Sequence, residues 1–192
     1  MSVSIANLKQ ALFISAILFE LIYILLFALT IKLPGFRFWP PPSSRSWQFF
    51  TSWLIASLVA VDFLFLGLLD FDSAFLDNWL RYPIGALLLV IGTIIGSWSF
   101  SKFGLRATIG LGDQLITDGP YRFSRNPQYI ADCINILAFM LITNSWMVWM
   151  IGILGVILNL MAPYTEEPWL VERFGEEYLQ YKKTVPRFIG RI

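Results

Sequence analysis

The sequence predicts an all-α, polytopic membrane protein with about five transmembrane helices and a cytoplasmic C-terminal amphipathic helical segment. Of its 192 residues, 57% are hydrophobic and only 14% are charged, whereas a soluble domain has about 25% charged residues. The apolar residues gather in long runs, which is typical of membrane-spanning helices. Most basic residues fall in alternate connections between those runs, as expected of a multi-pass protein.

Three apolar runs in the first half are each long enough to cross a bilayer. They cover residues 11–31, 47–69 and 82–100. A helix rises about 1.5 Å per residue, so about 20 residues cross a hydrocarbon core of roughly 30 Å. Gly92 and Gly96 are four residues apart in the third run, which allows another helix to approach closely.

Acidic residues interrupt the first two runs. Glu20 lies in the first and Asp62 in the second. A carboxylate is costly in lipid, and we interpret both as paired with a polar group between helices. Pro34 and Gly35 end the first run, and the proline-rich residues 39–44 form a stiff, non-helical connection.

Two shorter apolar runs follow, at residues 129–142 and 146–161. As helices they would be about 21–24 Å long, which predicts a tight hairpin with its polar flanks drawn towards the membrane surface. After Pro163 the chain becomes charged. We interpret residues 166–183 as an amphipathic helix, or a pair of helices, on the membrane face.

The basic residues predict the orientation of the chain. With five spans, twelve of the fourteen Lys and Arg share one side, and only Lys9 and Arg81 lie opposite. Because Lys and Arg accumulate in cytoplasmic loops, the N-terminus is predicted outside and the C-terminus in the cytoplasm. The length suits one domain, with three spans in residues 1–100 and a cofactor-binding loop, hairpin and C-terminal segment in residues 101–192.

Composition argues against two classes of partner. A net charge of +1 gives no electrostatic support to nucleic-acid binding. The chain has no histidine and one cysteine, Cys133, so the usual zinc and haem ligand sets cannot form. We therefore expect neither nucleic acid nor metal among its partners, and expect membrane lipids instead.

The polar residues flanking the hairpin form an ordered set of motifs. Residues 118–122 read Asp-Gly-Pro-Tyr-Arg, and residues 125–129 read Arg-Asn-Pro-Gln-Tyr. After the hairpin come Glu166-Glu167, then residues 174–178, Phe-Gly-Glu-Glu-Tyr, and residues 185–187, Val-Pro-Arg. In order and spacing, residues 111–187 resemble the isoprenylcysteine carboxyl methyltransferase and phospholipid methyltransferase superfamily of integral membrane methyltransferases.

The resemblance implies S-adenosylmethionine as cofactor and methyl transfer to a lipophilic acceptor, such as an isoprenylcysteine-like carboxylate, a thiol or a phospholipid. The cofactor-binding residues that it implies are Asp113, Gln114, Leu115, Ile116, Gly119, Tyr121, Asn126, Pro127, Gln128, Tyr129 and Glu166. The chemistry of these residues is suitable. Glu166 can bind the cofactor's ammonium group, Arg125 or Asn126 its carboxylate, and tyrosine rings its sulfonium.

Two departures from the family pattern concern the acceptor. Asn126 occupies the position of a family histidine; it can still form hydrogen bonds but cannot act as a general base. Ala162 occupies the position of an arginine that contacts substrate in the isoprenylcysteine enzymes. The catalytic residues therefore stay open, with Arg125, Asn126 and Glu167 as candidates. For an amine acceptor, Asp118, Glu167 or water would take the proton.

Other interpretations of the same residues remain. The tyrosines and Glu166 can simply anchor helices at the interface. Asp132, one turn beyond Tyr129, can border the cofactor or acceptor pocket. At the level of function, the alternatives are a membrane reductase of the sterol-reductase-like type that uses NADPH, and a non-catalytic lipid-binding membrane protein.

Overall fold

A computed structural model describes residues 4–108, 110–112 and 114–190. These residues form α-helices and one short 3-10 helix, with no strand among them. The elements are α1 (Ile5–Lys32), α2 (Trp47–Leu69), α3 (Arg81–Thr108), η1 (Gly119–Arg122), α4 (Pro127–Thr143), α5 (Trp146–Phe174) and α6 (Glu176–Thr184). The predicted all-α class is confirmed.

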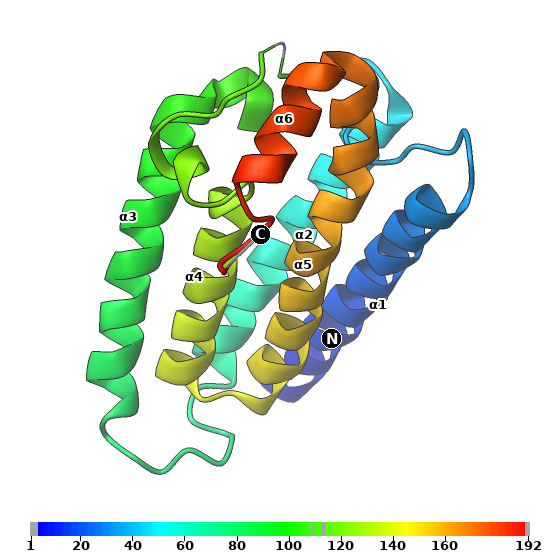
Figure 1. Cartoon of the computed structure of the whole chain (residues 1–192). Helices are drawn as coiled ribbons and strands as arrows, with labels where there is room; N and C mark the ends of the chain where they lie inside the picture. The colour runs from blue at the N-terminus through cyan, green and yellow to red at the C-terminus, as the bar shows by residue number, and fades with distance from the viewer. Residues whose placement is uncertain (1–3, 109, 113, 191–192) are drawn as a thin grey trace.

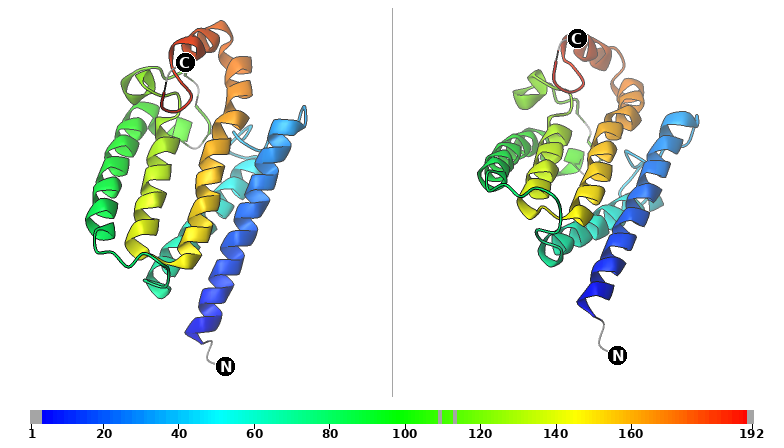
Figure 2. Two further views of the ribbon diagram at one scale, coloured as in Figure 1. Left: turned by 60° about the horizontal axis from the view of Figure 1, so that its bottom comes forward. Right: turned by 90° about the horizontal axis from the view of Figure 1, so that it is seen from below.

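The five long helices form one bundle. In Figure 1, α3, α4, α5 and α1 lie side by side, with α2 behind them and α6 at the upper end. Both views in Figure 2 show the same order. Helix α4 packs against α3 and α5, α1 packs against α2 and α5, and α2 also contacts α4. The middle of the bundle is therefore bordered by all five helices.

Among the described residues, four helices are long and apolar enough to cross a membrane: α1, α2, α5 and the part of α3 from Arg81 to Lys102. Helix α4 is also apolar but has only 17 residues, or about 26 Å at 1.5 Å per residue. It lies between α3 and α5 in the same layer. The protein is thus a polytopic helical membrane protein, as predicted, with α4 its shortest apolar helix.

Helix α5 is longer than the sequence predicts. The predicted span ended at Met161, before Pro163, whereas α5 continues through Pro163 and Pro168 to Phe174. Proline removes one helical hydrogen bond and usually kinks or ends a helix. Here side-chain contacts made by Glu166 and Glu167 hold the segment against the rest of the bundle. The predicted pair of short hairpin arms is therefore wrong for the second arm.

Glycines bring α3 close to α4. A Cβ atom on Gly85 would lie 2.6 Å from Cγ1 of Ile142, and one on Gly92 would overlap the Asn135 amide. At Gly96 the added Cβ would be 3.5 Å from Ala131 Cβ, an ordinary contact. The close approach predicted from the spacing of Gly92 and Gly96 is thus made by α4, chiefly at Gly92 and Gly85.

The two acids inside the first spans behave differently. Asp62 accepts a hydrogen bond from the Ser15 hydroxyl of α1, so its predicted pairing between helices is confirmed. Glu20 is only 2% exposed, and its Oε2 has no hydrogen-bond partner in the part of the chain that the structure describes. The predicted pairing is wrong for Oε2 of Glu20.

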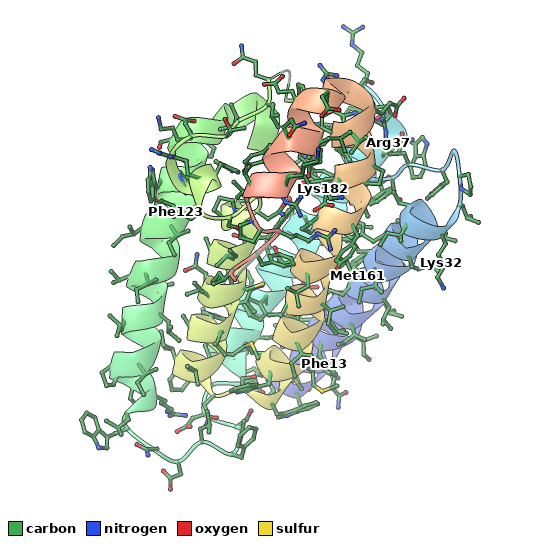
Figure 3. All side chains as sticks on the ribbon, in the orientation of Figure 1. Phe13, Lys32, Arg37, Phe123, Met161 and Lys182 are labelled. Atoms are coloured by element: carbon green, nitrogen blue, oxygen red, sulfur yellow. The ribbon has the colours of Figure 1, made fainter. Side chains whose placement is uncertain are left out.

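Basic side chains gather at one end of the bundle. Arg37 and Lys182 lie in the upper half of Figure 3 and Lys32 lies near its middle, while Phe13 lies near the lower end. Helix α6 and the ends of α1 and α5 share the upper end. That grouping agrees with the side on which the sequence places most Lys and Arg; the direction across the membrane stays a prediction.

Candidate functional site

Two cavities lie next to each other inside the bundle. The larger has a volume of about 600 Å³ and is bordered by side chains of α1 to α5. The smaller, about 60 Å³, lies between α6, the end of α5 and the segment before η1. Three residues line both cavities: Tyr121, Gln128 and Glu166. A group bound in one cavity would therefore reach the other past these three side chains.

Glu166 is fixed by residues from two other segments. Its Oε1 accepts a hydrogen bond of 2.6 Å from Trp39 Nε1 and another from the Tyr129 hydroxyl. Trp39 belongs to the proline-rich connection after α1, and Tyr129 to the first turn of α4. The Glu166 carboxylate therefore lies at the boundary of the two cavities, and its Oε1 already accepts two hydrogen bonds.

Tyr121 forms the wall between the cavities. It lies in η1 and is 2% exposed. Its hydroxyl donates to Gln128 Oε1 at 3.1 Å, and its carbonyl accepts from the Tyr181 hydroxyl of α6 at 2.7 Å. Burial, with the nearby Glu166, raises the pKa of Tyr121 well above its ordinary value.

Glu167 is the centre of a buried cluster of charges. It is 5% exposed and accepts hydrogen bonds from Arg187 Nε at 2.7 Å and Nη2 at 2.8 Å. Arg125 Nη2 lies 3.1 Å and Lys182 Nζ 3.2 Å from the same carboxylate. With three cations around it, Glu167 is unsuited to accept a proton from a substrate.

Arg125 borders the smaller cavity. Its side chain is 7% exposed and lines that cavity. Nη2 pairs with Glu167, whereas Nε and Nη1 are buried and have no hydrogen-bond partner among the described residues. Buried donors are normally satisfied, so these two nitrogens are suited to bind an anionic group.

Asn126 holds the C-terminal segment. It is 5% exposed, and its Nδ2 donates to the Arg187 carbonyl at 2.9 Å. The Ser124 hydroxyl donates to the same carbonyl at 3.2 Å, and Arg125 N donates to the Pro186 carbonyl at 2.9 Å. Asn126 also lines the smaller cavity, but its side-chain N–H donates to the Arg187 carbonyl and so holds the C-terminal segment in place.

The structure brings most of the predicted cofactor residues together. Gln114, Leu115, Ile116, Tyr121, Asn126, Gln128 and Glu166 line the smaller cavity. Tyr129 lines the larger one, while Pro127 begins α4 and Gly119, with φ 59°, forms the turn into η1. Asp113 lies outside the described residues. Asp118 is exposed, pairs with Lys102 at 2.6 Å and lines neither cavity.

Several lining residues are absent from the sequence prediction. Trp39 was predicted only as part of a connection, and Tyr178 and Tyr181 only as part of the amphipathic C-terminal segment. The structure places Trp39 on Glu166 and both tyrosines on the smaller cavity. Trp39 and Glu166 are 127 residues apart, and no local pattern signals such a contact.

Comparisons with known proteins agree with this architecture. The sequence model of the phospholipid methyltransferase family matches residues 80–177. The cobalt-zinc-cadmium resistance protein CzcN of Cupriavidus metallidurans is 28% identical over 140 residues, 70% of this chain and 62% of its own length. Phosphatidylethanolamine N-methyltransferase B of Dictyostelium discoideum is 26% identical over 126 residues, 61% of this chain and 63% of its own.

The name of a third relative states a different activity. Steroid 5-alpha-reductase DET2 of Solanum lycopersicum is 23% identical over 112 residues, 58% of this chain and 43% of its own length. The chain thus spans less than two thirds of each of these relatives, and no solved structure matches it. Because the family match covers half of the sequence and includes α3, η1, α4 and all of α5, the chain belongs to the phospholipid methyltransferase family.

Proposed function

We propose that this protein transfers a methyl group from S-adenosylmethionine to a lipophilic acceptor at the cytoplasmic face of the membrane. The observation that carries the proposal is Arg125, which lines the smaller cavity and has two buried guanidinium nitrogens, Nε and Nη1, without a hydrogen-bond partner among the described residues. Membership of the family supports methyl transfer as the class of reaction.

The residues of the smaller cavity fit the parts of the cofactor. The Nε and Nη1 donors of Arg125 match a carboxylate, since such charge-assisted bonds are strong and directional. Leu115 and Ile116 are suited to cover the adenine, and the rings of Tyr121 and Tyr129 to face the sulfonium. Glu166 offers negative charge to the ammonium group. When bound, the cofactor supplies a methyl carbon activated by its positive sulfur.

Cofactor binding requires the smaller cavity to widen, because about 60 Å³ is much less than the volume of a nucleoside with an amino-acid chain. Residues 114–116 border it without regular secondary structure, and Gln114 is exposed. We expect this segment to move outwards on binding, while Arg125 and Glu166, fixed by their partners, keep their positions.

The larger cavity suits the acceptor. Its volume of about 600 Å³ and its mainly apolar walls match a lipid chain. It meets the smaller cavity at Tyr121, Gln128 and Glu166. For methyl transfer at that boundary, the protein would chiefly have to hold the acceptor in line with the methyl group of the cofactor.

Binding of S-adenosylhomocysteine, measured by isothermal titration in detergent, tests the cofactor. Incubation with methyl-labelled S-adenosylmethionine and total membrane lipids then tests transfer, with the labelled product identified by mass. We expect saturable binding and a labelled lipophilic product. A folded protein that shows no binding at millimolar ligand refutes the proposal.

A second candidate is a membrane reductase that uses NADPH, which is favoured by the similarity to the steroid 5-alpha-reductase DET2. The same titration with NADPH separates the two. A reductase binds NADPH and is indifferent to S-adenosylhomocysteine; a methyltransferase shows the reverse. A non-catalytic lipid-binding protein binds neither nucleotide.

A further inference from the structure

The larger cavity contains acidic side chains and no basic ones among its described lining residues. Glu20 of α1, Asp132 of α4 and Glu166 of α5 all line it. Glu166 has partners in Trp39 and Tyr129. The other two carboxyl groups are not explained by the cofactor site, because neither lines the smaller cavity.

Glu20 is a buried acid with an unused oxygen. It is 2% exposed, and its Oε2 has no hydrogen-bond partner among the described residues. Gly155 of α5 is a neighbour of this carboxyl: a Cβ at residue 155 would lie 3.4 Å from Glu20 Oε1, an ordinary contact. An unpartnered acid in an apolar setting costs stability, and acids inside membrane spans usually serve a ligand or a transported group.

Asp62 provides the contrast within the same bundle. It is also an acid inside a span and is 6% exposed, but it accepts a hydrogen bond from Ser15 and does not line the cavity. The hydrogen bond of Asp62 links α1 to α2, which explains this acid structurally. Among the described residues, Oε2 of Glu20 makes no such bond.

Glu20 and Asp132 each lie three residues from a tyrosine that lines the larger cavity. Glu20 precedes Tyr23 on α1, and Asp132 follows Tyr129 on α4, whose hydroxyl donates to Glu166. Helices α1 and α4 run in opposite directions (Figure 1). Both acids therefore lie towards the same end of the bundle from their tyrosines, about 4.5 Å along each helix.

We propose that Glu20 and Asp132 determine acceptor specificity, selecting a lipophilic acceptor with a basic amine over one with a carboxylate. An anionic head group would meet three carboxyl groups and, among the described lining residues, no cation, which is unfavourable at low dielectric. An ammonium group satisfies the unused oxygen of Glu20. Glu20 lies outside the family match at residues 80–177, so the assignment depends on the fold of this chain.

The inference rests on the proposed function for the step that follows binding. An alkylammonium acceptor first gives one proton to a carboxylate of this pair. The nitrogen lone pair then forms a C–N bond to the methyl carbon as the C–S bond breaks, and sulfur keeps that electron pair. The products are a methylated ammonium and a neutral thioether, and the released proton remains on the carboxyl group.

The binding test needs no cofactor. Tritiated dodecylamine is bound to the full-length protein in phosphatidylcholine nanodiscs, and unlabelled dodecylamine, dodecanol and dodecanoate compete with it. We expect dodecanoate to compete at least tenfold more weakly than dodecylamine. We also expect Glu20→Gln and Asp132→Asn each to weaken dodecylamine binding at least tenfold, about 1.4 kcal/mol.

Two variants serve as matched controls. Asp62→Asn removes an intramembrane acid away from the cavity, and Glu177→Gln removes an exposed acid on α6. Both should bind dodecylamine as the wild type does. Equal competition by dodecanoate and dodecylamine overturns the inference, as does unchanged amine affinity in both Glu20→Gln and Asp132→Asn.

Titration of the same preparations with S-adenosylhomocysteine separates this inference from the proposed function and verifies folding of the variants. Cofactor binding without amine preference overturns the acceptor assignment alone. Amine preference without cofactor binding supports the acceptor site and refutes the methyltransferase. Variants that lose amine binding but keep wild-type cofactor affinity support the assignment directly.

Discussion

Arg187 and Glu167 are joined by two hydrogen bonds, from Nε at 2.7 Å and from Nη2 at 2.8 Å. This pair ties the segment after α6 to the end of α5. The Arg187 carbonyl, in turn, accepts from Asn126 and Ser124. The C-terminal segment therefore holds the motif before α4 in the position where Arg125 faces the smaller cavity.

The first prediction concerns this cluster. Glu167→Gln leaves Arg125 and Arg187 buried or half-buried without their counter-ion, and breaking a buried pair costs about 3–5 kcal/mol. We expect a clearly lower thermal unfolding temperature in detergent. Glu177→Gln, on the exposed face of α6, is the control. A Glu167→Gln protein as stable as the control contradicts this role.

The second prediction tests the boundary between the cavities. Glu166→Ala and Tyr129→Ala each remove one partner of a hydrogen bond beside the proposed sulfonium position. We expect each to weaken S-adenosylhomocysteine binding at least tenfold, about 1.4 kcal/mol. Tyr82→Phe, at the opposite end of the bundle in α3, should leave the affinity unchanged. Wild-type affinity in both site variants would exclude this site.

The third prediction isolates Arg125. Arg125→Lys keeps a positive charge near Glu167 but lacks the planar set of N–H donors that suits a carboxylate. We expect at least tenfold weaker binding of S-adenosylhomocysteine and little change for methylthioadenosine, which has no amino-acid group. Titration with both ligands distinguishes the cases: an equal loss for the two would mean that Arg125 acts only through the fold.

The sequence predicted the helices better than their contacts. Residues 47–69 coincide with α2 because an apolar run between polar ends determines a membrane span locally. The end of α5 was missed because Pro163 is a local stop signal, whereas contacts of Glu166 with Trp39 and Tyr129 keep the helix in place.

The same reason limits prediction of the site. Motif order indicated Tyr121, Gln128 and Glu166, which the fold does bring together. It could not indicate that Asn126 donates to the Arg187 carbonyl, 61 residues away, or that Glu20 faces the larger cavity. Both contacts depend on how the helices pack, which residue type alone does not determine.

At the opposite end of the bundle, Asp70 joins three segments. It is 3% exposed and accepts hydrogen bonds from Lys9 at 2.6 Å, Ser73 at 2.6 Å and Ser145 at 2.7 Å. These donors come from α1, the connection after α2 and the turn between α4 and α5. Burial acts to raise the pKa of Asp70, but the hydrogen bonds and the charge of Lys9 outweigh it, so the pKa is lowered.

The last prediction follows from the sign of that shift. Because the folded pKa of Asp70 lies below its unfolded value of about 3.9, its contribution to stability is present above that value and is lost as pH falls through the folded pKa. Asp70→Asn should therefore lower the unfolding temperature in detergent at pH 7, and its difference from wild type should shrink below about pH 4. Asp77→Asn, on the exposed part of the same connection, should match wild type at pH 7. A difference between Asp70→Asn and wild type that stays constant from pH 7 to pH 3 would show that the carboxylate charge does not carry the stabilisation.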